Sequence, residues 1–160
     1  MLKNSKDVVI VSALRTVIGK YKGMWAKIEA HNLGRSVIEN ILFQSKVNQS
    51  SIDEVIMGQV LTGGTGQNPA RQAAKGAGIP DQKTAYNINQ VCGSGLRAII
   101  SGYQSILLND SKIIIAGGQE NMSFSNQDNM LQDGLIDAFN NYHMGVTAEN
   151  VAEKCNISRK

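Results

Sequence analysis

The chain has 160 residues, of which 42% are hydrophobic and 18% charged, and its net charge is +3. This is typical of a globular domain with a sizeable core, and the scattered Lys and Arg residues give no reason to expect nucleic acid as a partner. Two cysteines and two histidines exclude a disulfide framework and the usual metal-binding spacings. The apolar run from Val8 to Val11 is too short to span a membrane, so we expect a cytoplasmic protein without a membrane partner.

Short apolar runs rich in β-branched residues alternate with helical patterns over most of the chain. The predicted strands cover 8–14, 55–61, 85–90 and 112–116. The predicted helices cover 33–42, the segment from Pro69 to Gly76 or Gly78, and the segment from just after Cys92 to Leu107. This alternation predicts an α/β layered domain with a mostly parallel sheet flanked by helices.

The predicted helices differ in their caps and in the faces that they present. Asn32 is the predicted cap of the first, and Asn68 followed by Pro69 is the predicted start of the second. The second helix carries a stripe of alanines, against which another element must pack closely: Ala70, Ala73, Ala74 and Ala77. The third has the most regular apolar face in the chain, so we expect it at the buried centre of the domain. That face consists of Leu96, Ile99, Ile100, Tyr103, Ile106 and Leu107.

Two further segments have a simple structural explanation. The glycine-rich loop 63–66 lacks the spacing of a dinucleotide or Walker motif, so a plain turn is favoured and a nucleotide site is the weaker alternative. Residues 120–142 are polar and without a clear period, which indicates an excursion from the sheet. A last helix follows Thr147, and Cys155 falls on its apolar side, where we expect it to pack.

Cys92 lies between a predicted strand and the N-terminus of a predicted helix, in the run Asn89-Gln90-Val91-Cys92-Gly93-Ser94-Gly95-Leu96. The unpaired N–H groups of a helix's first turn favour a thiolate, which is the attacking form of cysteine. Gly93 and Gly95 allow a sharp turn and a close approach of substrate. Cys92 is therefore a candidate nucleophile, and a buried cysteine in a tight turn is the alternative. No residue of the chain clearly provides the general base that a nucleophile needs.

Four stretches, in this order and spacing, resemble the N-terminal part of the thiolases of acetyl-CoA acetyltransferase type, over about Val8 to Arg159. They are Gly66-Gln67-Asn68-Pro69-Ala70-Arg71-Gln72-Ala73, the run around Cys92, Ala116-Gly117-Gly118-Gln119-Glu120-Asn121-Met122-Ser123, and His143-Met144-Gly145-Val146-Thr147-Ala148-Glu149-Asn150-Val151-Ala152. The resemblance implies a thiolase-like fold, with residues 1–120 as the N-terminal domain and residues 121–160 as the start of a loop domain that covers coenzyme A.

The resemblance also implies the chemistry. Cys92 would accept an acyl group from an acyl-CoA, and a second acetyl-CoA would attack the acyl-cysteine to give acetoacetyl-CoA, or the reverse. The backbone at Cys92 and Gly93 would form the turn that holds the thioester oxygen. Coenzyme A thioesters would be substrates, with no separate cofactor and no metal. His143 and Met144 match the segment that contacts pantetheine in the family.

Further implications concern partners and departures from the family. Asn68, Arg71 and Ala74 fall where thiolases form their dimer, so a homodimer or tetramer is expected. Gln119 stands where many relatives have Met, and Phe124-Ser125-Asn126 replaces a small-residue and proline pattern, so the preferred acyl chain is open.

The family's second half carries a histidine in Gly-His-Pro and a second cysteine in Cys-x-Gly-Gly-Gly, and these motifs do not occur in the 160 residues. We therefore expect about half of an active site, with the C-terminal domain absent from this chain. Either a separate C-terminal half supplies the rest, or the chain is an inactive fragment or an interaction module. On either hypothesis the chain exposes an apolar face, which favours poor solubility or self-association.

Overall fold

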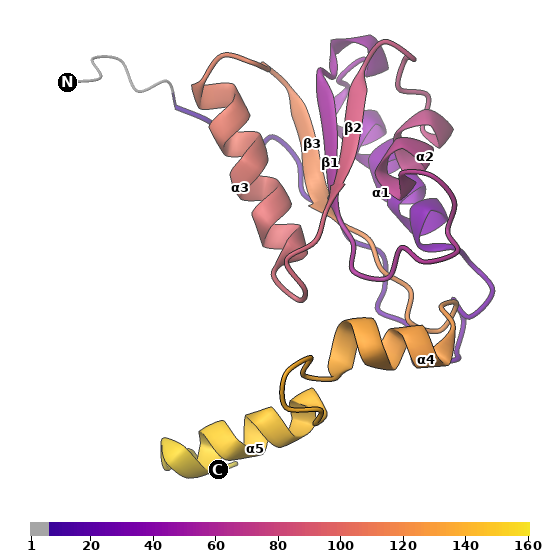
Figure 1. Ribbon diagram of the computed structural model, residues 1–160. Helices are drawn as coiled ribbons and strands as arrows, with labels where there is room; N and C mark the ends of the chain where they lie inside the picture. The colour runs from indigo at the N-terminus through magenta and orange to yellow at the C-terminus, as the bar shows by residue number, and fades with distance from the viewer. Residues whose placement is uncertain (1–6) are drawn as a thin grey trace.

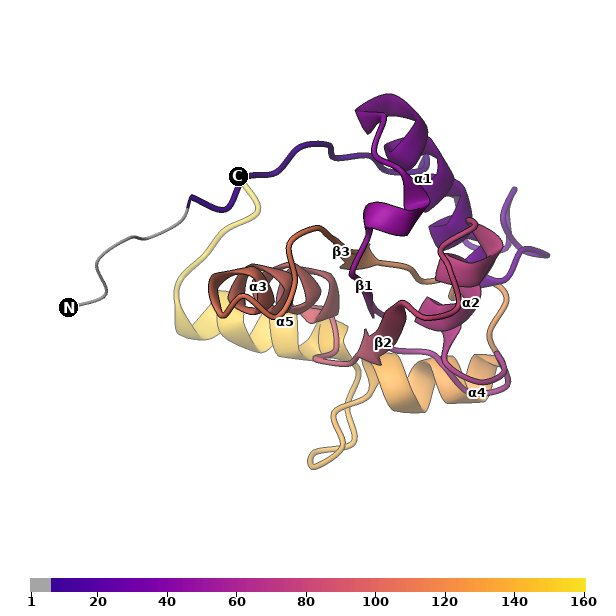
Figure 2. The ribbon, with the colours of Figure 1, turned by 90° about the horizontal axis from the view of Figure 1, so that it is seen from above.

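The computed structural model describes residues 7–160, so the first six residues of the predicted N-terminal domain lie outside the described part. Its sheet consists of three parallel strands in the order β2-β1-β3. They are β1 (Glu54–Gly58), β2 (Thr84–Ile88) and β3 (Ile114–Gly118). Helices α1 (Ala30–Ser45) and α2 (Pro69–Gly76) cover one face of the sheet, and α3 (Ser94–Leu107) covers the other (Figure 1 and, from above, Figure 2). The predicted α/β class is confirmed.

The remaining helical elements are short or lie away from the sheet. A 3-10 turn (Gln49–Ser51) precedes β1, and α4 (Gln127–Met130) continues into a π-helical turn (Leu131–Leu135). Helix α5 (Met144–Lys154) ends the chain's regular structure. Figure 1 shows α4 and α5 beyond the ends of the strands toward which the arrows point, so the polar excursion after β3 is real. No helix among residues 7–160 is long and apolar enough to cross a membrane.

The strand predicted at 8–14 is wrong. This segment joins none of the three strands of the sheet, and Val9, Ile10 and Val11 leave more than 70% of their surface exposed. A strand needs a neighbour that accepts and donates its backbone hydrogen bonds, and the described residues provide none here. The β-branched residues indicated a strand correctly by propensity, but propensity does not provide a partner.

The core lies between the sheet and the pair α1–α2. Ile38 and Leu42 of α1 pack there with Val55 and Met57 of β1 and with the alanine stripe of α2. The stripe therefore packs inside this chain: Ala74 has no exposed surface, because α1 lies directly on α2. This corrects the prediction that the Ala74 side chain contacts a second copy.

Helix α3 packs on the sheet through its small residues rather than its large ones. Ser94, Ala98 and Gly102 are its buried positions, and a Cβ at Gly102 would lie 3.3 Å from the side chain of Ile114 in β3. Most of the apolar face predicted to be buried is instead exposed, with Leu96 at 66% and Tyr103 at 49%. Ile100 and Ile106 of that face are half-buried. Because small residues let the helix approach the sheet closely, the large side chains on the far side of the helix keep much of their surface exposed within residues 7–160.

The helix caps were predicted with mixed success. Asn68 caps α2 as predicted, since its Oδ1 accepts a hydrogen bond from the backbone N–H of Arg71 at 3.0 Å. Helix α1 instead begins after Glu29, which makes no side-chain cap. Asn32, the predicted cap, lies in the first turn and donates to the Glu29 carboxylate at 3.3 Å.

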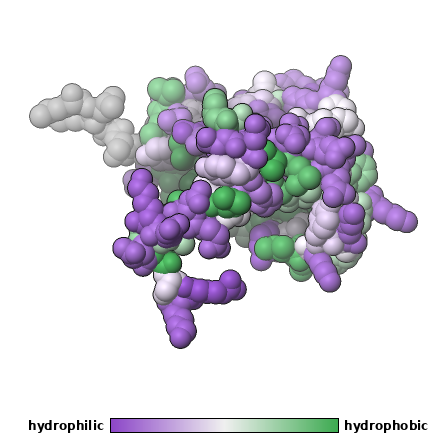
Figure 3. All heavy atoms as spheres, turned by 60° about the horizontal axis from the view of Figure 1, so that its bottom comes forward, coloured by the Kyte–Doolittle hydropathy of each residue, from purple (hydrophilic) through white to green (hydrophobic). Residues whose placement is uncertain are grey.

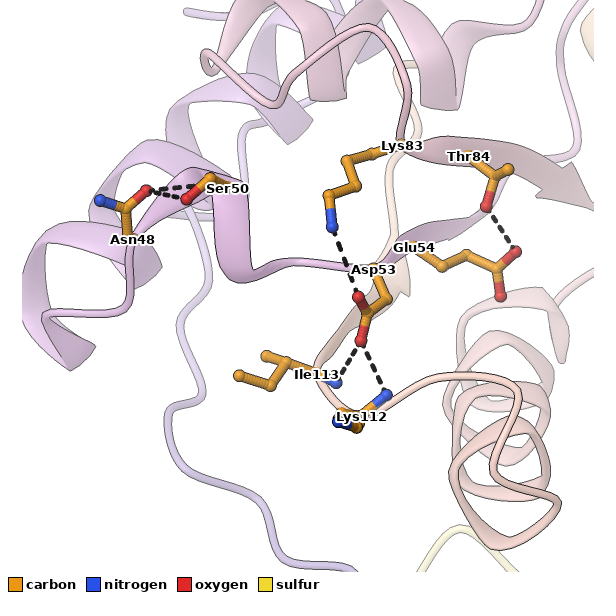
Figure 4. Close-up of polar contacts among 8 residues, drawn as sticks. All are labelled: Asn48, Ser50, Asp53, Glu54, Lys83, Thr84, Lys112 and Ile113. Carbon is orange, nitrogen blue, oxygen red and sulfur yellow. Dashed lines mark hydrogen bonds and ion pairs between the residues drawn. The ribbon is translucent and has the colours of Figure 1, made fainter.

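Asp53 joins the starts of all three strands (Figure 4). Its Oδ2 accepts hydrogen bonds from the backbone N–H groups of Lys112 at 2.8 Å and Ile113 at 3.2 Å, just before β3. Its Oδ1 lies 3.4 Å from the Nζ of Lys83, just before β2. The backbone hydrogen bonds from Lys112 and Ile113, followed by the contact with Lys83, hold the pKa of Asp53 below its ordinary value. The opposite, carboxyl end of the sheet is thereby left for the loops that carry the candidate site.

Candidate active site

Cys92 lies in the loop between β2 and α3, at the carboxyl end of the sheet (Figure 1). Its side chain is exposed and is not part of a disulfide. Gly93 is the N-cap residue of α3, so Cys92 directly precedes the cap. Loops at the carboxyl ends of parallel strands are where α/β proteins bind their ligands. The alternative of a buried packing cysteine is therefore wrong for Cys92.

The turn that carries Cys92 is held in an unusual backbone conformation. Val91 has a φ of 48°, in the left-handed region that β-branched residues rarely adopt. The hydroxyl of Ser94 donates to the Val91 carbonyl oxygen at 2.6 Å and accepts from the Gln90 N–H at 2.8 Å. The Gly93 N–H donates to the Gln90 carbonyl oxygen at 3.0 Å. The predicted turn at Cys92 and Gly93 is present, and the Gly93 N–H is used to close it.

Three glycines allow the N-terminus of α3 to sit directly on the ends of two strands. A Cβ at Gly58, the last residue of β1, would lie 2.5 Å from the backbone nitrogen of Gly95. A Cβ at Gly118, the last residue of β3, would lie 3.3 Å from the Cα of Gly95. Side chains at these positions would push the helix away, so the glycines fix where Cys92 emerges.

Glu120 ties the loops that leave β1 and β3. Its carboxylate accepts hydrogen bonds from the backbone N–H groups of Val60 at 2.8 Å and Leu61 at 3.3 Å. Glu120 is exposed as a whole residue, but partial desolvation of its carboxylate raises the pKa of Glu120, although these hydrogen bonds act in the opposite direction. Sequence reasoning missed this residue, because its partners are backbone groups about sixty positions away and leave no side-chain pattern.

Gln119, flagged in the sequence as a departure from relatives, points into the interior. It is 6% exposed, and its Nε2 donates to the Gln59 Oε1 at 2.8 Å. Its Oε1 has no hydrogen-bond partner among residues 7–160 and lies against Gly34 of α1. Phe124, the first residue of the other departure, is 41% exposed. The amide of Gln119 therefore packs in the interior, beneath the loops at the carboxyl end of the sheet, and does not form part of an open surface.

His143 caps helix α5. Its Nδ1 accepts a hydrogen bond from the backbone N–H of Gly145 at 2.9 Å. A neutral imidazole whose Nδ1 accepts carries its proton on Nε2, so the exposed Nε2–H is a donor. This tautomer suits hydrogen bonding to a ligand and does not suit a general base. Met144 follows as the first residue of the helix and is half-buried.

Cys155 does not pack as predicted, because it is exposed just beyond the end of α5. Its neighbours on the helix, Ala148 and Val151, are exposed too. Figure 3 shows the side of the molecule toward α4 and α5, with hydrophobic side chains reaching the surface in separate places among hydrophilic ones. Within residues 7–160, no three His, Cys, Asp or Glu side chains are grouped so as to hold a metal ion.

The remaining predicted positions are on α2 and in the glycine-rich loop. Arg71 donates to the backbone carbonyl oxygens of Asp81 and Lys83, and Asn68 donates to that of Ala85 at 2.9 Å. Asn68 therefore holds α2 against β2, and Arg71 holds it against the segment just before β2. The contact of both residues with a second copy stays a prediction. The loop 63–66 is a plain turn, since the Thr65 hydroxyl donates to the Thr62 carbonyl oxygen at 2.7 Å.

The fold and the site define a parallel α/β domain that presents a cysteine at the start of a helix. Residues 8–160 match the family described as "Thiolase, N-terminal domain", so the chain belongs to the thiolase family. Acetyl-CoA acetyltransferase of Pseudomonas aeruginosa is 49% identical over 97% of the chain, and the cytosolic acetyl-CoA acetyltransferase of Rattus norvegicus is 47% identical over 100% of it.

The comparison with solved structures agrees. The crystal structure of Bacillus anthracis acetyl-CoA acetyltransferase superimposes with a TM-score of 0.88 at 33% identity over 94% of the chain. The chain nevertheless spans only 44% of the length of the two curated relatives and 42% of the crystallised chain. It corresponds to less than half of each of these proteins.

Proposed function

We propose that this chain provides the nucleophile of an acetyl-CoA acetyltransferase and depends on a C-terminal half for the remaining catalytic groups. The observation that carries the proposal is the exposed Cys92 thiol on its strained turn at the carboxyl end of the sheet. The names of the relatives, which cover nearly the whole chain, support the choice of substrate.

The reaction proceeds in two steps. The Cys92 thiolate attacks the carbonyl carbon of acetyl-CoA, a carbon–sulfur bond forms, and coenzyme A leaves as a thiolate that takes up a proton. A base then removes a proton from the methyl carbon of a second acetyl-CoA. The resulting carbanion attacks the acyl-cysteine, a carbon–carbon bond forms, and Cys92 leaves as thiolate with acetoacetyl-CoA as product. The reverse sequence is thiolysis.

The chain's own groups support the first step more than the second. We infer that the backbone N–H of Cys92, before the first turn of α3, stabilises the developing oxyanion. His143 and Met144 contact the pantetheine arm, the imidazole through its Nε2–H and the thioether through apolar contact. His143 is not the base, since its Nδ1 already accepts a hydrogen bond from Gly145.

The base and the proton donor come from a second polypeptide or a longer form of this one. The exposed apolar face of α3, with Leu96, Ile99 and Tyr103 at its surface, is where we place the C-terminal half. Homodimers or tetramers form through the region of Asn68 and Arg71. A cytoplasmic location is consistent with the relative named cytosolic.

The proposal is tested by incubating the 160-residue chain with acetyl-CoA and measuring the intact mass. We expect one acetyl group in the parent chain and in Cys155→Ala, and none in Cys92→Ala. Cys155 is the matched control because it is exposed too. An acetyl group that persists in Cys92→Ala removes the assigned role.

The competing hypothesis, an inactive fragment or interaction module, is favoured by the same exposed apolar face of α3. A second assay separates the two: acetoacetyl-CoA formation is measured with and without the C-terminal half of a full-length relative. Turnover that appears only on addition supports the nucleophile role. Acylation without turnover in either case supports an inactive fragment.

A further inference from the structure

The turn before α3 combines a disfavoured backbone conformation with an unusually complete set of hydrogen bonds. A β-branched residue at a φ of 48° is strained. Such strain persists only where surrounding contacts over-determine it. Relaxation of Val91 to the extended region would swing the following residue, Cys92, away from the start of the helix.

Several hydrogen bonds oppose this relaxation. The Val91 N–H donates to the Asn89 Oδ1 at 2.9 Å, and one buried side chain makes two more. The Ser94 hydroxyl forms hydrogen bonds on both sides of the Gln90–Val91 peptide bond. It accepts from the Gln90 N–H and donates to the Val91 carbonyl oxygen. Ser94 is 4% exposed, so water does not replace these bonds. Arg97, one turn further along α3, makes a further contact on the exposed side of the turn, since its Nε donates to the Gln90 Oε1 at 2.6 Å.

We propose that Ser94 is a positioning residue for the nucleophile: its hydroxyl holds Val91 in the left-handed conformation, which fixes where the exposed Cys92 thiol emerges before the start of α3. Arg97 supports the same turn from outside. This inference rests on the proposed role of Cys92, but its consequence is the reactivity of the thiol toward any electrophile, which is measured without thiolase turnover.

The experiment uses the 160-residue chain with Cys155→Ala, so that Cys92 is the single thiol, and iodoacetamide as the probe. The rate of alkylation is measured from pH 5 to pH 10 by mass spectrometry, and folding of each variant is checked by circular dichroism. In Ser94→Ala we expect a rate at neutral pH lower by roughly five-fold, the size of a typical helix-terminus effect. Ser105→Ala, on the same helix, is the control and keeps the parent profile.

A double-mutant cycle separates positioning from a general loss of structure. Val91→Gly adopts a positive φ without strain, so the Ser94 hydroxyl has less to hold. We expect Ser94→Ala to slow alkylation much less in the Val91→Gly background than in the parent. An equal loss in both backgrounds, or an unchanged profile in folded Ser94→Ala, overturns the proposal.

If Ser94→Ala does not fold, the alkylation rate of Arg97→Gln tests the proposal instead. Arg97→Gln leaves the buried Ser94 hydroxyl in place, and we expect a smaller loss of the alkylation rate. An unchanged profile in folded Arg97→Gln then refutes the assignment. Failure of acetyl transfer from acetyl-CoA, with these alkylation results intact, would instead count against the proposed function alone.

Discussion

The carboxylate of Glu120 lies 2.8 Å from the backbone nitrogen of Val60 and accepts its hydrogen bond. This contact joins the loop that leaves β3 to the loop that leaves β1, across the end of the sheet where Cys92 emerges. The Gln119 N–H adds a second link, because it donates to the Gly58 carbonyl oxygen at 2.9 Å. The two strands are therefore tied beyond their last regular pair.

Glu120 makes stability depend on pH. Partial desolvation raises its pKa above the ordinary value of 4.5, so the folded chain binds this proton more readily than the unfolded chain. Its favourable contribution is complete below 4.5 and is lost as the pH rises through the raised folded value. We expect Glu120→Gln to flatten this part of the stability curve, measured by urea unfolding at a series of pH values. If stability declines with rising pH in Glu120→Gln as it does in the parent chain, the decline is due to another titratable group.

Asp53 is expected to act in the opposite direction. The hydrogen bonds from Lys112 and Ile113 lower its pKa, so its contribution is present above the unfolded value of 3.8 and is lost as the pH falls through the lower folded value. Asp53→Asn removes the charge that holds three strand starts, and after solvent screening we expect a loss of about 1–2 kcal/mol at neutral pH. Urea unfolding measures this loss.

Asp133→Asn is the matched control for Asp53, since Asp133 is an exposed aspartate in the π-helical turn. We expect its free energy of unfolding to stay within ~0.5 kcal/mol of the parent value, as for most surface substitutions. Equal effects of the two substitutions would show that net charge, and not the contacts of Asp53, determines the change.

Local signals were enough to predict α2 and the turn at Cys92. Asn68 followed by Pro69 predicts a helix start because the capping hydrogen bond joins residues only three positions apart, and the structure contains that cap. The position of Cys92 between strand and helix was likewise predictable, because each neighbouring element has its own pattern. What the sequence could not reveal is the left-handed Val91, since β-branched residues disfavour that conformation and only the tertiary contacts of Ser94 stabilise it.

Contacts between distant segments account for the errors. The pattern at 8–14 predicts a strand, but no described strand pairs with it. The face of α3 is apolar, yet the sheet selects the small residues Ala98 and Gly102. Cys155 and Ala74 show the same limit in opposite directions, one exposed and one buried, because periodicity identifies a face without identifying what covers it.

Gly58 is expected to be intolerant of any side chain. A Cβ there would overlap the backbone of Ser94 and Gly95, so Gly58→Ala must displace the start of α3 or fail to fold. Gly117→Ala is the matched control on the neighbouring strand β3, because no atom of the described part of the chain lies within 4 Å of a Cβ at that position. We expect a large loss of thermal stability in Gly58→Ala and a small change in Gly117→Ala, measured by circular dichroism. Equal melting temperatures would contradict the close packing of α3 on β1.

The exposed face of α3 is expected to cause self-association of the 160-residue chain. Leu96, Ile99 and Tyr103 are exposed on one side of the helix, and contiguous apolar surface of this kind favours association in water. We expect Ile99→Gln combined with Tyr103→Gln to shift the chain toward monomer in sedimentation velocity. Phe43→Gln is the control, since Phe43 is 83% exposed on α1, on the opposite face of the sheet. A sharply monomeric parent chain would contradict the idea that this face needs a partner, whereas an equal effect of Phe43→Gln would show that association is not specific to α3.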